Sequence, residues 1–320
     1  MPHEMETAHS EALPDCSRRS LLAGGAAMLA LCAAGRPGLA AAQALADPLT
    51  PIPLPPQAPV TEGMAQLAGT KLWFWDTGGS GVPVVLLHPA SGSGLIWGYQ
   101  QPVFAKAGYR VISYSRRGYY GSAPLDRANP GTASEDLHQL ADFLGLGRFH
   151  VVGSAAGGSV ASDYAFSHPE RLFSLTISSN QFGVTDGDIS AAGARIRLPN
   201  FEEIPVEFRE LGPSYRACNP EGFKLWVELE RKSGLTGMAT FRQPLKNRIT
   251  DAMLPALKPP VLVICGAADL LTPPSIARMI AAKIPHAELV VAPEAGHSVY
   301  WEEPEVFNRA VLAFIAKHHG

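Results

Sequence analysis

Residues 151–161 read VVGSAAGGSVA and mark a point where a buried strand turns into a helix. The apolar run Phe149–Val152 precedes the turn, and Ala156–His168 has the pattern of a helix that ends before a proline. The surrounding glycines suit a sharp strand-to-helix turn, although tight packing alone could also explain them. Such a turn lifts its central residue, Ala155, over the sheet edge at a helix N-terminus, where negative charge is favoured. The geometry is typical of a catalytic nucleophile, yet position 155 carries only a methyl group.

Strand-like and helix-like segments alternate on both sides of this turn. The expected strands are Leu72–Asp76, Pro83–Leu87, Arg110–Tyr114, Phe149–Val152, Leu172–Ser178, Val261–Cys265 and Glu288–Val291. The expected helices are Trp97–Ala107, Thr132–Leu144, Ala156–His168, Ser275–Ile284 and Pro304–His318. Several of these strands are continuous apolar runs, as in sheets that are buried on both faces. The order predicts an α/β fold with a mainly parallel central sheet and helices on both faces.

One long interval interrupts the alternation. Residues 183–258 contain helix-like pieces, such as Val206–Leu211, Pro220–Ser233 and Asn247–Leu257, and no convincing strand. An insertion of this length between two strands is typical of a cap over the strand ends. We therefore expect a helical cap at 183–258, inserted between core segments 65–182 and 259–320.

The N-terminus has the layout of a bacterial export signal. Arg18 and Arg19 directly precede the apolar run 21–34, and small residues follow, so residues 1–46 resemble a twin-arginine signal. The run is too short for a spanning helix, which needs about 20 apolar residues, so we expect no stable membrane anchor. Residues 47–64 begin with a proline-rich stretch and are expected to form an extended leader. The mature protein is then periplasmic or secreted.

The composition favours a protein that handles a small molecule. The formal net charge is −3 and no block of Lys and Arg is present, so we expect no nucleic-acid partner. The sequence shows neither metal-ligand spacing nor a phosphate-binding glycine loop, so no cofactor is expected. Of the four cysteines, Cys218 and Cys265 lie beyond the signal, in segments that favour two separate thiols.

Two titratable residues follow successive strands near the C-terminal end. Asp269 comes just after the strand Val261–Cys265, and His297 lies in a glycine-flanked loop after the last strand. Because the carboxyl ends of parallel strands meet at one edge of a sheet, the two fit a histidine base and the acid that orients it. Alone, Asp269 could equally cap the following helix. The N–H groups of Ala90 and Ala156 are candidates for an oxyanion hole.

Taken in order, the motifs of the chain resemble the α/β-hydrolase family over residues 65–318. They are His88-Pro89, Arg117-Gly118-Tyr119-Tyr120-Gly121-Ser122, the turn at 153–157, Gly266 to Asp269 with Pro273, and Gly296-His297. The resemblance implies that Ala155 occupies the nucleophile position, Asp269 that of the acid and His297 that of the base. It also places Ala90 and Ala156 at the two oxyanion donors. Pro89 stands where the family usually has glycine.

Three accounts of Ala155 remain open at this point. In the first, the residue replaces a catalytic serine in an inactivated variant. In the second, the alanine is natural, and His297 with Asp269 activates water or deprotonates a substrate. In the third account Ser154, one residue before the apex, attacks instead. The first predicts cleavage of a carboxylic ester or lactone; the second also admits carbon–carbon bond hydrolysis and cofactor-free lyase chemistry. A ligand-binding protein without catalysis is the alternative of another class.

Aromatic residues gather on loops and on pieces of the expected cap. We expect these side chains to line a pocket for a small, largely apolar or aromatic substrate, with core packing as the alternative. They are Trp97, Tyr119, Tyr120, Trp226, Tyr300 and Trp301.

Overall fold

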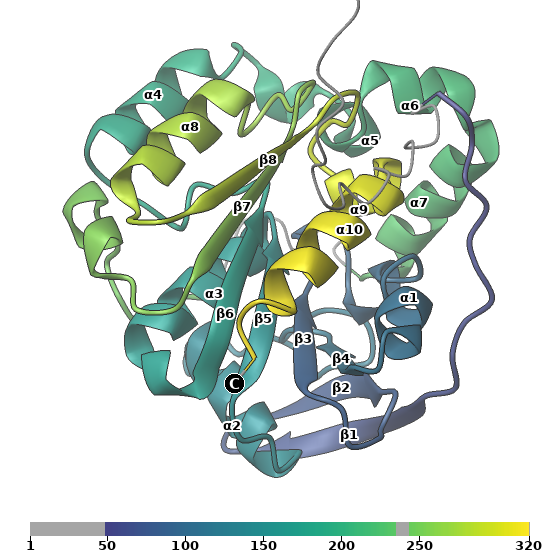
Figure 1. Ribbon diagram of the computed structural model, residues 1–320, viewed down its shortest axis with the longest axis vertical. Coiled ribbons are helices and arrows are strands. Elements are labelled where there is room, and N and C mark those ends of the chain that lie inside the picture. The colour runs from purple at the N-terminus through teal and green to yellow at the C-terminus, as the bar shows by residue number, and fades with distance from the viewer. Residues whose placement is uncertain (1–48, 235–242, 320) are drawn as a thin grey trace, which may run out of the picture. The chain divides into compact units, whose positions relative to one another are not determined.

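A central sheet of eight strands organises residues 49–234 and 243–319, the part of the chain that the computed structural model describes (Figure 1). The sheet order is β1-β2-β4-β3-β5-β6-β7-β8, in which β3 to β8 are parallel and β1 and β2 form an antiparallel edge. The strands are β1 (Thr61–Leu67), β2 (Thr70–Asp76), β3 (Pro83–Leu87), β4 (Arg110–Tyr114), β5 (Phe149–Ser154), β6 (Leu172–Ser178), β7 (Val261–Gly266) and β8 (Glu288–Ala292). The expected mainly parallel α/β sheet is confirmed. The expected export signal, 1–46, lies outside the described residues.

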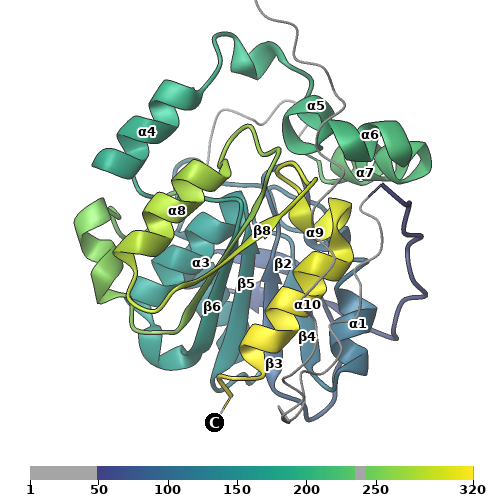
Figure 2. The same cartoon turned by 45° about the horizontal axis from the view of Figure 1, so that its top comes forward.

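Helices cover both faces of this sheet (Figures 1 and 2). The described helices are α1 (Gln101–Lys106), α2 (Ala133–Phe143), α3 (Ala156–Ser167), α4 (Asp188–Ile196), α5 (Val206–Glu210), α6 (Pro213–Cys218), α7 (Pro220–Lys232), α8 (Pro274–Lys283), α9 (Val299–Glu302) and α10 (Pro304–Ile315). Short 3₁₀ helices lie at Gly94–Ile96, Pro169–Arg171, Phe201–Glu203 and Asp251–Ala256. Within the described ranges, every helix is too short or too polar to cross a membrane.

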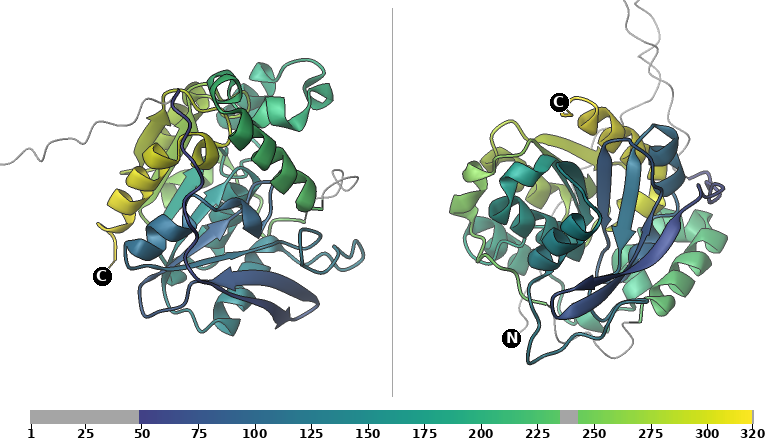
Figure 3. Two further views of the ribbon diagram at one scale, coloured as in Figure 1. Left: turned by 90° about the vertical axis from the view of Figure 1, so that its right-hand side faces the viewer. Right: turned by 90° about the horizontal axis from the view of Figure 1, so that it is seen from below.

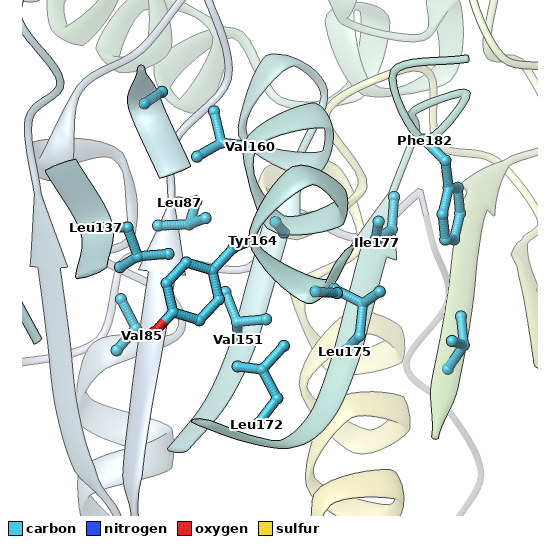
Figure 4. Packing of buried hydrophobic residues seen from close by; sticks show 14 of the residues in the cluster. Val85, Leu87, Leu137, Val151, Val160, Tyr164, Leu172, Leu175, Ile177 and Phe182 are labelled. Carbon is cyan, nitrogen blue, oxygen red and sulfur yellow. The ribbon is translucent and has the colours of Figure 1, made fainter. Parts of the chain in front are cut away.

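The two faces of the sheet carry separate hydrophobic cores because successive side chains of a strand point to opposite faces. Val85 and Leu87 of β3 pack on one face with α2, α3 and α8, where Figure 4 shows Leu137 and Tyr164. Their neighbours Val84 and Leu86 pack on the other face with α1 and α10. A fully buried Val or Leu side chain contributes about 1.5–3 kcal/mol to folding, so both faces must stay covered.

The sheet begins earlier than the sequence suggested. Strand β1 starts at Thr61, inside the stretch 47–64 that we assigned to the leader, and pairs with β2 at the sheet edge (Figure 3). An edge strand needs little apolar surface, and in β1 the fully buried side chain is that of Ala65, so no hydrophobic alternation marked it. Gly63 lies opposite Phe74 in this pairing. A glycine suits the position, because a Cβ there would lie only 2.8 Å from the Phe74 ring.

The described residues before β1 have no regular structure but are held against the domain. The Gln101 side chain accepts from the Ala58 N–H at 2.9 Å and donates to the Ala58 carbonyl at 2.7 Å. The Tyr99 hydroxyl donates to the Ile52 carbonyl at 2.7 Å. This segment is therefore a docked strap across the region of α1.

Between β6 and β7, the described residues form helices α4 to α7 and two 3₁₀ helices, with no strand among them. Figure 2 shows α4 to α7 above one end of the sheet, with α5, α6 and α7 grouped near α9, whereas the 3₁₀ helix Asp251–Ala256 lies at the side, near α8. Two expected helices are shorter than predicted. Trp97–Ala107 is helical only from Gln101, and Asn247–Leu257 holds a 3₁₀ helix that contains Pro255, because proline cannot donate the hydrogen bonds of an α-helix.

The start of α3 approaches β3 so closely that only glycine fits at position 157. A Cβ on Gly157 would overlap the carbonyl oxygens of Leu87 and His88, both of which belong to the backbone. Neither oxygen can move without disturbing the sheet or the loop that follows it.

We expect Gly157→Ala to lower the free energy of unfolding by at least 1–3 kcal/mol, the approximate cost of overpacking, because backbone atoms must shift. Urea unfolding followed by tryptophan fluorescence measures the change. Gly147→Ala is the matched control, since a Cβ there meets nothing within 4 Å. Equal stability of the two variants would contradict the close approach.

Candidate active site

The turn after β5 holds Ala155 in a strained conformation. Its backbone angles are φ 47° and ψ −120°, in a region that residues with a Cβ rarely occupy. The Ala155 N–H donates to the Ser178 carbonyl at 2.9 Å, and its own carbonyl accepts from the Gly158 N–H at 2.8 Å. The backbone of a nucleophile turn is thus present, with a methyl group at its apex.

The neighbouring serine does not replace the missing nucleophile. Ser154 is the last residue of β5, and its side chain is fully buried. A hydroxyl inside the core cannot reach a substrate, so burial removes the account in which Ser154 attacks.

Asp269 and His297 lie side by side at the ends of β7 and β8. The His297 Nδ1 is 2.9 Å from Oδ1 and 3.0 Å from Oδ2 of Asp269. The N–H groups of Leu271 and Thr272 donate to Oδ1 at 2.8 and 2.9 Å, which fixes the carboxylate from its own loop. Asp269 does not cap α8, whose N-cap residue is Pro273. The structure therefore brings together the two residues that the sequence proposed as base and orienting acid.

The two groups change each other's proton affinity. Burial alone disfavours the Asp269 anion, but the His297 charge and the hydrogen bonds that Asp269 accepts outweigh burial and leave its pKa below the usual value. Burial likewise lowers the pKa of His297, but the negative charges of Asp269 and Glu210 outweigh it and raise that pKa to about 9. His297 is therefore protonated at neutral pH.

The two expected oxyanion donors follow neighbouring parallel strands, β3 and β5. Ala90 follows β3, and Ala156 is the first residue of α3, where N–H groups have no intrahelical partner. Among the described residues, neither N–H donates to another protein group. Arg116 stabilises the loop that contains Ala90, because its guanidinium donates to the carbonyls of His88 and Pro89 at 3.1 and 3.0 Å.

The cap segment is joined directly to the histidine loop. The main-chain carbonyl of Glu210 accepts from the N–H groups of His297 and Ser298 at 2.8 and 3.0 Å. The Glu302 carboxylate accepts from Gly212 at 2.6 Å, Gly296 at 3.0 Å and Ser298 at 3.2 Å. Neither Glu210 nor Glu302 was expected from the sequence, because the contacts that join the cap to the histidine loop link residues far apart in the chain.

Four of the six aromatic residues expected to line a pocket belong to the core instead. The side chains of Trp97, Trp226, Tyr300 and Trp301 are at most 1% exposed, so they face no solvent-filled pocket. Trp97 packs against Tyr300, with ring centroids 4.9 Å apart. Position in a loop or cap piece suggested exposure, but the elements fold over one another and bury these large apolar surfaces.

The remaining two aromatic residues, Tyr119 and Tyr120, lie nearer the surface. Tyr119 packs on the His88 ring at 4.5 Å and under the Arg116 guanidinium. Tyr120 is 37% exposed and packs edge-on against Trp73. Arg117, in the same motif, is structural, because its guanidinium is buried in an ion pair with Asp136 at 2.6 Å.

Comparisons with known proteins agree with this architecture. The profile of the alpha/beta hydrolase family matches residues 84–310. A Caulobacter sp. (strain K31) protein named "Putative carbamate hydrolase RutD" is 33% identical over 73% of this chain and 90% of its own length. A Burkholderia vietnamiensis protein named 2-hydroxy-6-oxononadienedioate/2-hydroxy-6-oxononatrienedioate hydrolase is 29% identical over 78% of this chain and 93% of its own.

A solved structure shows the same fold. The thermophilic esterase from Thermogutta terrifontis superposes with a TM-score of 0.69 at 26% identity, covering 81% of this chain and 100% of the esterase. The residues that match the family profile, 84–310, include strands β4 to β8, helices α4 to α7 and the loops that hold Asp269 and His297. This chain belongs to the alpha/beta hydrolase family and is an enzyme of that family.

Proposed function

We propose that this hydrolase cleaves a carboxylic ester or lactone by direct attack of water, which His297 activates, without an acyl-enzyme intermediate. One observation carries the proposal: His297 and Asp269 keep a close, buried pairing at the sheet edge where β5 ends in a nucleophile turn that holds only the Ala155 methyl group. A protein that only binds a ligand needs no such base and orienting acid. Calorimetry with product analysis separates the two, since the binder predicts heat of binding without product.

The chemistry follows from the positions of the groups. Asp269 holds Nδ1 of His297, which leaves Nε2 for the reaction. Water occupies the space that a serine hydroxyl would fill; neutral His297 takes its proton while the oxygen attacks the carbonyl carbon. The N–H groups of Ala90 and Ala156 receive the developing oxyanion. His297 then returns the proton to the leaving oxygen, so that ester and water become acid and alcohol.

The names of the relatives leave a second candidate substrate class. The Burkholderia protein is named as a hydrolase of a 6-oxo dicarboxylate, a substrate in which water cleaves a carbon–carbon bond. The same base and oxyanion donors serve that reaction. A panel of esters, lactones and 6-oxo carboxylates, analysed for products, tells the two apart.

The role of Ala155 is tested by comparing three forms of the enzyme on that panel. We expect His297→Ala to lower kcat/KM by roughly 10³-fold or more, because the water loses its base. Ala155→Ser should not raise turnover, because its hydroxyl occupies the site of the water. A gain on the order of 10⁴-fold in Ala155→Ser would show that the chain is an inactivated serine hydrolase and overturn the water mechanism.

The pH dependence of kcat/KM tests the base. His297 accepts a proton only when neutral, so the rate should rise about tenfold per pH unit toward the pKa of about 9 and level off above it. Because the folded-state pKa lies above the unfolded value, the stability from this group is complete below about pH 6.5 and is lost as the pH rises through about 9. Thermal unfolding is therefore measured at each pH alongside the rates, to show whether the protein is still folded. A rate that falls between pH 7 and 9 while the protein stays folded contradicts the role as base.

We also propose that the protein is exported through its twin-arginine signal. Replacing Arg18 and Arg19 together by lysine should retain the full chain in the cytoplasm of a bacterium with that export system, because the signal depends on the arginine pair. Cell fractionation measures the distribution, and a variant in which two residues of the leader are replaced serves as control. Unchanged export of the double variant contradicts the proposal.

A further inference from the structure

Glu210 brings a second carboxylate from the cap to the catalytic histidine. It is the last residue of α5 and is 8% exposed. Its Oε2 accepts from the Ser298 hydroxyl at 3.3 Å, and the Ser91 side chain also lies near the carboxylate. Ser91 follows the oxyanion donor Ala90, and Ser298 follows His297. The carboxylate therefore lies between the loop of the oxyanion donor and the loop of the base.

The positive group that acts on this carboxylate is His297. Within residues 49–234 and 243–319, no lysine or arginine forms an ion pair with Glu210. Burial favours the neutral carboxyl and raises its pKa, whereas the His297 charge favours the anion. Ionised Glu210 and protonated His297 thus stabilise each other. Burying an acid without a compensating charge or hydrogen bond is costly, so the contacts with the histidine loop are what hold Glu210 there.

We propose that Glu210 is a positioning residue of the catalytic site, whose carboxylate stabilises protonated His297 and whose main-chain carbonyl fixes the histidine loop. The inference rests on the proposed function in that His297 is the acting base. The other charged groups that face the histidine come from different elements: Asp269 follows β7 and Glu302 lies in α9. Glu210 alone among the three comes from the cap, so it links the cap to the proton chemistry.

The link has a direct consequence for the reaction. By favouring the imidazolium, Glu210 makes neutral His297 a stronger base and protonated His297 a weaker acid, and it raises the pH above which His297 is neutral. Glu210→Gln removes the charge while its main-chain carbonyl still accepts from His297 and Ser298. The substitution therefore tests the charge separately from the loop contacts.

The titration of His297 is measured by NMR on the full protein, labelled with ¹⁵N-histidine. Loss of one resonance in His297→Ala identifies the signal. We expect Glu210→Gln to lower the midpoint by about one pH unit, the size of effect that a neighbouring charge produces, and to lower the pH midpoint of kcat/KM in parallel. Glu210→Asp keeps the charge but withdraws it on a shorter side chain, so it should lower the midpoint by a smaller amount than Glu210→Gln does.

Glu207→Gln is the matched control, since Glu207 lies on the same helix and is only half-buried. In this variant the titration midpoint of His297 should equal that of the unchanged protein. An unshifted midpoint in folded Glu210→Gln overturns the inference. If that variant does not fold, an unshifted midpoint in Glu210→Asp does so, because the shorter side chain withdraws the charge. Because NMR needs no substrate, failure of the ester panel leaves this test intact, and an unshifted midpoint leaves the hydrolase proposal intact.

Discussion

The paired hydrogen bonds between His297 and Asp269 set the arrangement of the whole site. Both residues sit on loops that leave neighbouring parallel strands, so the register of β7 with β8 decides whether the side chains can meet. Burial of the pair weakens solvent screening and makes each charge count more. That is why Glu210, contributed from far along the chain, can influence the same proton.

The turn at Ala155 has the backbone conformation of a nucleophile turn, and its apex carries a methyl group. Its positive φ has an energetic cost, yet the contacts that impose it belong to the sheet and to α3 rather than to any substrate. Gly157 must approach the end of β3 for the helix to pack at all. The strained turn is therefore part of how this domain folds, and chemistry at its apex is an added use.

Features set by local sequence were predictable, and features set by distant contacts were not. Strand β6 has the expected bounds, Leu172–Ser178, because apolar and small hydroxyl side chains alternate along it with the period of a strand. Asp269 and His297 were found because parallel topology places successive strand ends together. Strand β1 was missed because edge strands need little hydrophobic surface. The buried tryptophans were misassigned because burial depends on elements that pack from elsewhere, and the same applies to Glu210.

The Glu302 carboxylate accepts hydrogen bonds from three N–H groups, and these bonds limit how this enzyme can be re-engineered. One comes from Gly212 in the cap, and two come from the histidine loop. A Cβ at Gly212 would lie 2.8 Å from the Gly296 nitrogen, so another sequence cannot easily take its place. A chimera that exchanges the cap at its natural boundaries would cut this junction and displace the base. A graft that keeps residues 210–212 from the host would leave the junction whole, and the exchangeable part of the cap is accordingly smaller than its apparent length.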